Sequence, residues 1–147
     1  MLDKKDLIIL DTLKHNAKWS TYKIAKKTLI PITTVHNRIK KLEKAGIIKQ
    51  YTVILDHQKL GRGITAYVLV HYNVSVWGKE TTKENFRKNL LLLPGVEEIK
   101  YITGEYDIML KVRVKDMEEL NNLLLTNLRK IPGIGQTNSI FVLEDVK

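Results

Sequence analysis

The 147-residue chain contains no cysteine and only three prolines, and its four histidines have no metal-like spacing. The absence of cysteine excludes disulfide scaffolds, thiol chemistry and cysteine-ligated zinc. No apolar run approaches the roughly 18 residues that span a bilayer, and the charged start predicts no signal peptide. Glycine-rich phosphate loops and Ser/His/Asp arrangements are also missing. We therefore expect a cytoplasmic protein without membrane contact that is not an enzyme and holds no metal or cofactor.

Positive charge is in excess, and nearly all of the excess lies in the first 60 residues. Residues 1–60 contain 13 Lys and Arg against 5 Asp and Glu, a formal net charge of +8. Residues 61–147 contain 12 against 11, a net charge of +1. This asymmetry indicates that the N-terminal part binds a polyanion while the rest has another role. A solvated basic face is the alternative interpretation of the charge alone.

Three short helices are predicted before residue 46. Asp3 is the expected N-cap of the first helix, which ends near residues 15–16. Ser20 is the expected N-cap of the second helix, which stops before Pro31 because the residue preceding a proline is pushed out of the helical region. The third helix begins at this proline or at the next residue, and it ends at Gly46 as a C′ glycine. Two short helices joined by a tight turn are typical of a helix-turn-helix.

Residues 48–55 are predicted to form a strand, and the polar, glycine-containing residues 56–63 a hinge. We therefore expect a helix-turn-helix domain over residues 1–50, a strand linker and hinge over 51–63, and a second domain over 64–147. A domain of about 60 residues hides only about 60% of its unfolded surface. The first domain is accordingly expected to pack against a partner chain.

The second domain alternates strands and helices in the order βαββαβ. The expected elements are a strand over 64–74, a helix over 82–92, strands over 96–102 and 106–114, a helix over 117–131 and a strand over 137–143. This order predicts a ferredoxin-like arrangement and an α+β fold class. The last strand is apolar on both faces through residues 140–143, so the open face of the sheet is expected to be buried against another subunit.

The third helix combines an apolar stripe with a polar and basic face. Val35, Ile39 and Leu42 form the stripe expected to be buried. The opposite face carries the predicted DNA-binding side chains Thr33, Asn37, Lys40 and Lys44. Thr34, His36 and Lys41 lie on its flanks and Arg38 nearer the edge of the core, and all four belong to the same predicted set. In a helix-turn-helix, the early residues of the second helix reach base edges and later cations lie near phosphates. Asparagine pairs with adenine, and threonine contacts a thymine methyl or a base acceptor.

The start of the second helix adds Ser20, Thr21 and Lys23 to the predicted DNA-binding set. Lys23 occupies the N3 position, where a cation opposes the helix dipole but favours the approach of a phosphate. For Lys41 and Lys44 the alternative stays open that they are solvated lysines of an ordinary surface helix.

These residues resemble the Lrp/AsnC family, the feast/famine transcriptional regulators of bacteria and archaea. The matching stretches are Leu2-Asp3, Asp6, Ile9-Leu10, Ser20, Ile24-Ala25, Val35, Arg38-Ile39, Leu42-Glu43, Gly46-Ile47-Ile48, Tyr51, 102–108, 131–134 and Thr137. The resemblance implies a winged N-terminal DNA-binding domain, a strand linker and a ferredoxin-like domain that dimerises and often assembles further. The chain departs from the family at Leu29-Ile30-Pro31, where a small turn residue and a capping Ser are common. It departs again at Lys23, where Glu is frequent.

The resemblance also implies amino-acid effectors, bound between dimers near a turn made of Thr103, Gly104, Glu105, Tyr106 and Asp107. Backbone groups around Thr103–Gly104 and the Asp107 carboxylate would hold the ammonium and carboxylate of the amino acid. The residues by themselves leave a simpler interpretation open. Gly104 is then a hairpin glycine with positive φ, and Asp107 is a solvated turn acid.

We expect a sequence-specific transcriptional regulator that binds pseudo-palindromic operator DNA as a homodimer or a higher assembly of dimers. An amino-acid effector and the transcription machinery are further candidate partners. Two alternatives remain open: an amino-acid sensor, and a nucleoid-type architectural protein, each with weakly specific DNA binding.

Overall fold

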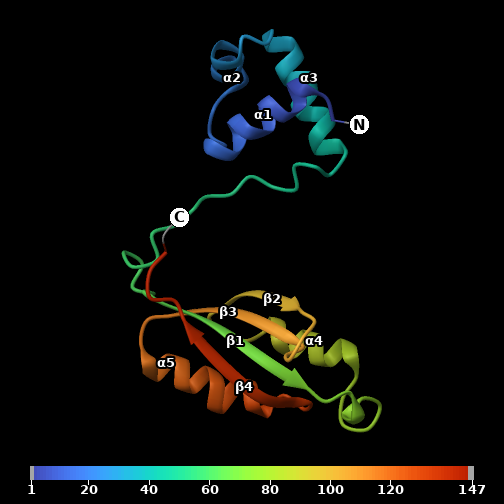
Figure 1. Ribbon diagram of the computed structural model, residues 1–147, viewed down its shortest axis with the longest axis vertical. Coiled ribbons are helices and arrows are strands. Elements are labelled where there is room, and N and C mark those ends of the chain that lie inside the picture. Colours follow the sequence, from blue (N-terminus) through green and yellow to red (C-terminus); the bar gives the residue numbers. More distant parts are fainter. Residues whose placement is uncertain (1, 146–147) are drawn as a thin grey trace. The chain divides into compact units, whose positions relative to one another are not determined.

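The computed structural model describes residues 2–145, which form two compact units divided between Leu55 and Asp56 (Figure 1). The first unit consists of three helices. The second consists of a four-stranded sheet and its helices. Among the described residues, no helix combines the length and the apolar character needed to cross a membrane.

The helices of the first unit are α1 (Lys4–His15), α2 (Thr21–Thr28) and α3 (Ile32–Lys44). Their apolar faces meet in one small core, and the predicted helix-turn-helix is confirmed. The fully or nearly buried members of this core are Ile9, Leu13, Ile24, Ile30 and Val35. With five buried side chains, this core is small, as expected for a unit of this size.

Local hydrogen bonds set the ends of these helices as the sequence predicted. Asp3 caps α1 and forms a capping box with Asp6, and the Ser20 hydroxyl accepts from the Lys23 N–H at 3.3 Å. After α3, Gly46 adopts a φ of +68°. Its N–H donates to the carbonyl of Glu43, and the Ile47 N–H donates to the carbonyl of Leu42. These two bonds form a Schellman motif, which satisfies the last carbonyls of the helix.

The strand predicted over residues 48–55 is wrong. Figure 1 shows no arrow over this segment, and residues 49–56 have no regular structure. The physical reason is that, within the described chain, no neighbouring strand supplies a hydrogen-bond ladder to it. Its start is held by the Tyr51 hydroxyl, which donates to Glu43 Oε1 at 2.8 Å. Partial burial and this hydrogen bond raise the pKa of Tyr51 to about 12.

The sheet of the second unit is antiparallel, with strand order β2-β3-β1-β4. The strands are β1 (Ile64–Tyr72), β2 (Val96–Tyr101), β3 (Ile108–Val114) and β4 (Ile134–Phe141). The connecting helices are α4 (Lys83–Leu91) and α5 (Met117–Asn121). This is the predicted ferredoxin-like βαββαβ arrangement.

Strict alternation along the central strands creates the core of this unit. Val68 and Val70 of β1 pair in register with Leu110 and Ile108 of β3, and all four are at most 1% exposed. They pack against Phe86 of α4 and the leucines of α5 and the segment that follows it. Both helices therefore cover the same face of the sheet (Figure 1).

Two predicted elements of this unit differ from the structure. After α5 the chain continues as a π-helical segment (Asn122–Asn127) and a short 3₁₀ turn (Leu128–Lys130) rather than as one α-helix. The wider π turn brings Leu123 and Leu128, five residues apart, into the core together. The last strand covers 134–141 rather than 137–143, because its ladder with β1 runs from the pair Tyr72–Ile134 to the pair Ala66–Phe141.

Two neighbouring leucines of α4 provide a test of this core. Leu90 is 1% exposed and Leu91 is 66% exposed. Leu90→Ala should lower the free energy of unfolding by about 2–5 kcal/mol, because it leaves a cavity. Leu91→Ala should change it by less than about 0.5 kcal/mol. Urea unfolding followed by circular dichroism measures both, and equal losses would contradict this packing.

Candidate nucleic-acid interface and effector turn

The surface of α3 divides as its sequence predicted. Of the predicted apolar stripe, Val35 and Leu42 are buried and Ile39 is half-buried against the core. The predicted DNA-binding residues on the other face are exposed: Thr33, His36, Asn37, Lys40, Lys41 and Lys44. Burial of one face therefore turns a polar and basic stripe toward solvent, with threonines and the amide near the N-terminus of the helix and lysines toward its C-terminus.

Four of the predicted residues line one hollow on the surface of the first unit. Thr34, Asn37, Arg38 and Lys41 surround it together with carboxylates at the start of α1. The hollow places a hydroxyl, an amide and an ammonium side by side. The hydroxyl and the amide suit base edges, whereas the two carboxylates of the same lining disfavour a phosphate inside the hollow.

Arg38 connects α3 to the N-terminus of α1. Its Nη1 lies 2.6 Å from Asp3 Oδ2 and 2.8 Å from Asp6 Oδ1. The Asp3 carboxylate also accepts from the N–H of Lys5 and of Asp6. One guanidinium thus bridges both acids of the α1 capping box. The structure gives Arg38 an intramolecular role that the sequence did not predict, and its contact with DNA stays a prediction.

These contacts favour the charged form of all three groups. The hydrogen bond from Arg38 is the main cause that lowers the pKa of Asp3. The Asp3 N–H and then Arg38 lower the pKa of Asp6. The two carboxylates in turn raise the pKa of Arg38. The cluster is therefore fully ionised at neutral pH.

Two lysines of α2 lie against the tryptophan that precedes this helix. The Nζ atoms of Lys23 and Lys27 lie 4.6 and 4.7 Å from the centre of the Trp19 ring. Cation–π attraction of this kind orders a side chain that otherwise samples many rotamers. The contact with the Trp19 ring is therefore a second reason for a lysine at position 23, besides the predicted approach of a phosphate. The i, i+4 spacing of Trp19 and Lys23 could have indicated this contact. Ser20 is exposed and Thr21 half-buried beside these groups.

The turn between β2 and β3 holds Asp107 by several hydrogen bonds. Asp107 Oδ2 accepts from the Tyr72 N–H at 3.0 Å, and the Asp107 N–H donates to the Val70 carbonyl at 3.0 Å. These two bonds continue the pairing of β1 with β3 beyond its last pair, Val70 and Ile108. Asp107 is therefore more than a solvated turn acid, because its carboxylate serves as the hydrogen-bond partner of the Tyr72 N–H at the end of this ladder. Gly104 has a φ of +130°, which favours glycine.

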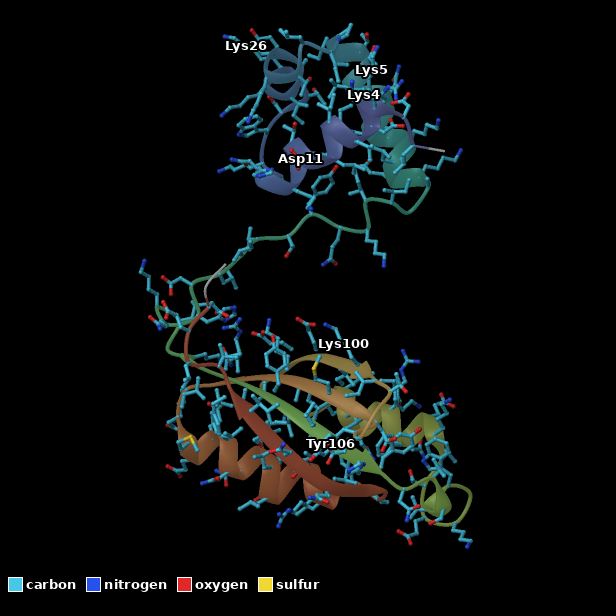
Figure 2. The ribbon with its side chains drawn as sticks, viewed as in Figure 1. Lys4, Lys5, Asp11, Lys26, Lys100 and Tyr106 are labelled. Atoms are coloured by element: carbon cyan, nitrogen blue, oxygen red, sulfur yellow. The ribbon has the colours of Figure 1, made fainter. Side chains whose placement is uncertain are left out.

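His71 completes this turn, and the sequence did not single it out. Its ring stacks on Tyr106 with centroids 4.5 Å apart, and its Nδ1 lies 3.5 Å from Asp107 Oδ2. The side chain of Tyr106 lies against the strands of the sheet (Figure 2). Thr103 and Glu105 are exposed on the same turn. Their role toward an amino acid stays a prediction.

Comparison with known proteins shows that each of the two units matches a protein-family model. Residues 2–49 match the family model described as winged helix-turn-helix DNA-binding. Residues 65–147 match the model described as Lrp/AsnC ligand binding domain.

Individual relatives span the whole chain. A helix-turn-helix transcriptional regulator of Pyrococcus furiosus is 37% identical over 147 residues, which cover 100% of this chain and 96% of the relative. The leucine-responsive regulatory protein of Haemophilus influenzae is 34% identical over 99% of this chain and 86% of its own length. A transcriptional regulator of Neisseria meningitidis, solved in complex with L-methionine, superposes with a TM-score of 0.90 at 27% identity, covering 100% of this chain and 93% of that one.

The cluster of Arg38 with the α1 carboxylates predicts acid sensitivity. Because the pKa of Asp6 is lowered by folding, its contribution to stability is present above the unfolded pKa of about 3.9 and is lost as the pH falls through the lower folded value. Asp6→Asn should lower the thermal midpoint at neutral pH and flatten the decline below about pH 4. Thermal unfolding at a series of pH values, followed by tryptophan fluorescence and circular dichroism, measures both the midpoint and its pH dependence.

Asp11→Asn is the matched control for this experiment, because the Asp11 side chain lies on the same helix and is 71% exposed. It should leave both the midpoint and its pH dependence nearly unchanged. If Asp6→Asn behaves like Asp11→Asn, the cluster does not stabilise the unit.

Proposed function

The chain belongs to the Lrp/AsnC family of transcriptional regulators, and on that basis we propose that it binds pseudo-palindromic operator DNA as a homodimer and responds to an amino acid. In this proposal residues 1–50 bind DNA, 51–63 link the domains, and 64–147 dimerise and bind the effector. Higher assembly of dimers, contact with the transcription machinery and a cytoplasmic location are parts of the same proposal.

The face of α3 is the observation that carries the DNA-binding proposal. Asn37 lies exposed one turn beyond Thr33, and Lys40 and Lys44 continue the same face. The first residues are suited to base edges and the later ones to phosphates. Lys23 and Lys27 add positive charge at α2, held by Trp19. The two recognition helices of a dimer would then enter successive major grooves about one helical turn apart.

The open face of the sheet supports the homodimer. Helices cover only one face, and the other presents Tyr67, Leu69, Met109 and Ile140 between strands. Ile140 is 49% exposed. Lys111 and Arg113 pair with Glu98 and Glu97 beside these apolar side chains, and Lys100 pairs with Glu98 at the edge (Figure 2). An apolar centre with a charged rim is typical of a subunit interface.

The linker supports the same assembly. Val53, Ile54 and Leu55 are 74%, 101% and 50% exposed, and they lie in a segment without a strand partner in the described chain. Three consecutive apolar residues in such a segment favour burial against a second chain.

The turn around Asp107 supports the effector proposal. Its carboxylate and the adjacent His71 place a negative and a titratable group beside exposed backbone at Thr103 and Gly104. An amino acid carries one ammonium and one carboxylate, which these groups complement. The Neisseria meningitidis structure named above contains L-methionine, so this amino acid is the first ligand to test.

Base readout by Asn37 provides the decisive experiment. We expect the protein to select one duplex from a random pool. Asn37→Ala should weaken binding to that duplex by about 1–3 kcal/mol and relax its base preference. Lys44→Ala should weaken all sequences alike and reduce the slope of log K against log salt by about 1. Fluorescence anisotropy titrations on selected and random duplexes measure both effects.

Lys88→Ala, on α4 of the second unit, is the control and should not change affinity. Equal losses for Asn37→Ala on selected and random DNA would contradict a reading role for Asn37. A specificity ratio near one for the wild-type protein would instead favour a sensor or an architectural protein.

Loss of the Asp107 charge should weaken the response to amino acids. L-methionine, and then each other protein amino acid, is added to the wild-type chain and the shift in thermal midpoint is recorded. Asp107→Asn keeps an oxygen acceptor for the Tyr72 N–H but loses the charge, so the affinity for the amino acid should fall tenfold or more, on the order of a charged hydrogen bond. Glu118→Gln, an exposed acid on α5, should retain the response. An unchanged response in Asp107→Asn would exclude this carboxylate from the effector site.

A further inference from the structure

The turn between α2 and α3 presents a leucine in an unfavourable state. Leu29 has a φ of +58° and is the one residue other than glycine with a positive φ in the described range. Its side chain is also 90% exposed. The left-handed region is disfavoured for a residue with a Cβ, and glycine or asparagine is usual at such a helix end. Neither the backbone conformation nor the exposure of Leu29 stabilises the free protein.

The neighbouring residues fix the backbone at this leucine. Thr28 Oγ1 donates to the Ile24 carbonyl at 2.8 Å, which closes the last turn of α2. Ile30, the next residue, is 6% exposed within the core of the unit. Pro31 then fixes the backbone at the start of α3, where the Val35 N–H donates to its carbonyl at 3.0 Å. The backbone that carries this apolar group is therefore already ordered before a partner binds, so that binding costs only the rotamer entropy of the leucine side chain.

Leu29 lies beside the reading end of α3. Ile32, the first residue of that helix, is 44% exposed, and Thr33 follows it on the predicted reading face. On the other side, exposed lysines 26 and 27 end α2, and Lys26 projects from the outside of this helix (Figure 2). The two apolar side chains are therefore set between cations and polar reading groups. A surface of this charge favours a polyanion over an apolar protein partner.

We propose that Leu29, with Ile32, contacts the C5 methyl group of a thymine at the edge of each half-site. This inference depends on the proposed binding of operator DNA. In the major groove, the thymine methyl is the apolar group that distinguishes one base from the others, and apolar side chains recognise it by contact. Leu29 then acts as a specificity determinant, since the left-handed turn fixes its side chain at the position where the recognition helix enters the groove.

Replacement of single thymines by deoxyuridine tests this contact directly, because it removes the methyl group and leaves base pairing intact. The duplex selected by the wild-type protein is titrated with each thymine replaced in turn. At one thymine in each half-site, the loss of the methyl should weaken wild-type binding about fourfold, the value for one buried methyl group. Replacement in both half-sites should weaken it about 15-fold.

The protein side of the test uses Leu29→Asn, which is similar in size, tolerates a positive φ and is polar. This variant should bind the thymine duplex about fourfold more weakly per half-site and should no longer distinguish thymine from uracil there. Its thermal midpoint should equal or exceed that of the wild-type chain, since an asparagine is less strained in this turn. Leu29→Gly provides a second variant with the same expected results. Leu7→Asn, at a 55% exposed leucine of α1, is the control and should retain the full thymine preference.

Three results would overturn the inference while leaving the proposed function intact. In the first, no replacement of a thymine by deoxyuridine weakens binding of the wild-type protein. In the second, such a replacement weakens binding of the Leu29 variants as much as binding of the wild-type protein. In the third, the Leu29 variants change self-association and leave DNA affinity unchanged. If the wild-type chain selects no sequence at all, the proposed function fails and this inference fails with it.

Discussion

Burial of one face of each amphipathic element determines what the opposite face presents. In the first unit, Val35 enters a very small core and Leu42 is buried on the same side of α3, so the other face of α3 is turned to solvent with its threonines, amide and lysines. In the second unit, Val68 and Val70 enter the core beneath the helices, so Tyr67 and Leu69 point to the open face of the sheet. The candidate DNA surface and the candidate dimer surface both follow from this constraint.

The small core of the first unit needs reinforcement from polar groups, and Arg38 supplies it. Its guanidinium connects α3 to both acids of the capping box of α1. The recognition helix is therefore held by charge-assisted hydrogen bonds as well as by apolar packing, which fixes the direction of its exposed stripe. Trp19 has a comparable effect on α2, where it orders two lysines. The orientation of the candidate DNA-binding groups thus depends on contacts within the first unit.

The turn between α2 and α3 relates the fold to the proposed specificity. Ile30 in the core and Pro31 at the start of α3 fix the backbone next to Leu29, which sets the direction in which its exposed side chain leaves the turn. In the second unit, the carboxylate of Asp107 continues the pairing of β1 with β3 and stays partly exposed. At Leu29 an unfavourable backbone conformation coincides with a predicted binding surface.

The sequence by itself determined the elements whose signals are local. Periodicity predicted α3 and the central strands, and caps at Asp3, Ser20 and Gly46 predicted the helix ends, because these interactions involve residues within a few positions of one another. The strand over 48–55 could not be decided in this way, since a strand needs a hydrogen-bonding neighbour and the described chain supplies none. The π-helical turn after α5 was likewise set by how Leu123 and Leu128 fit the core. Only the tertiary structure joined Arg38 to Asp3, 35 positions away, and His71 to Asp107, because contacts between distant residues leave no periodic signal in one sequence.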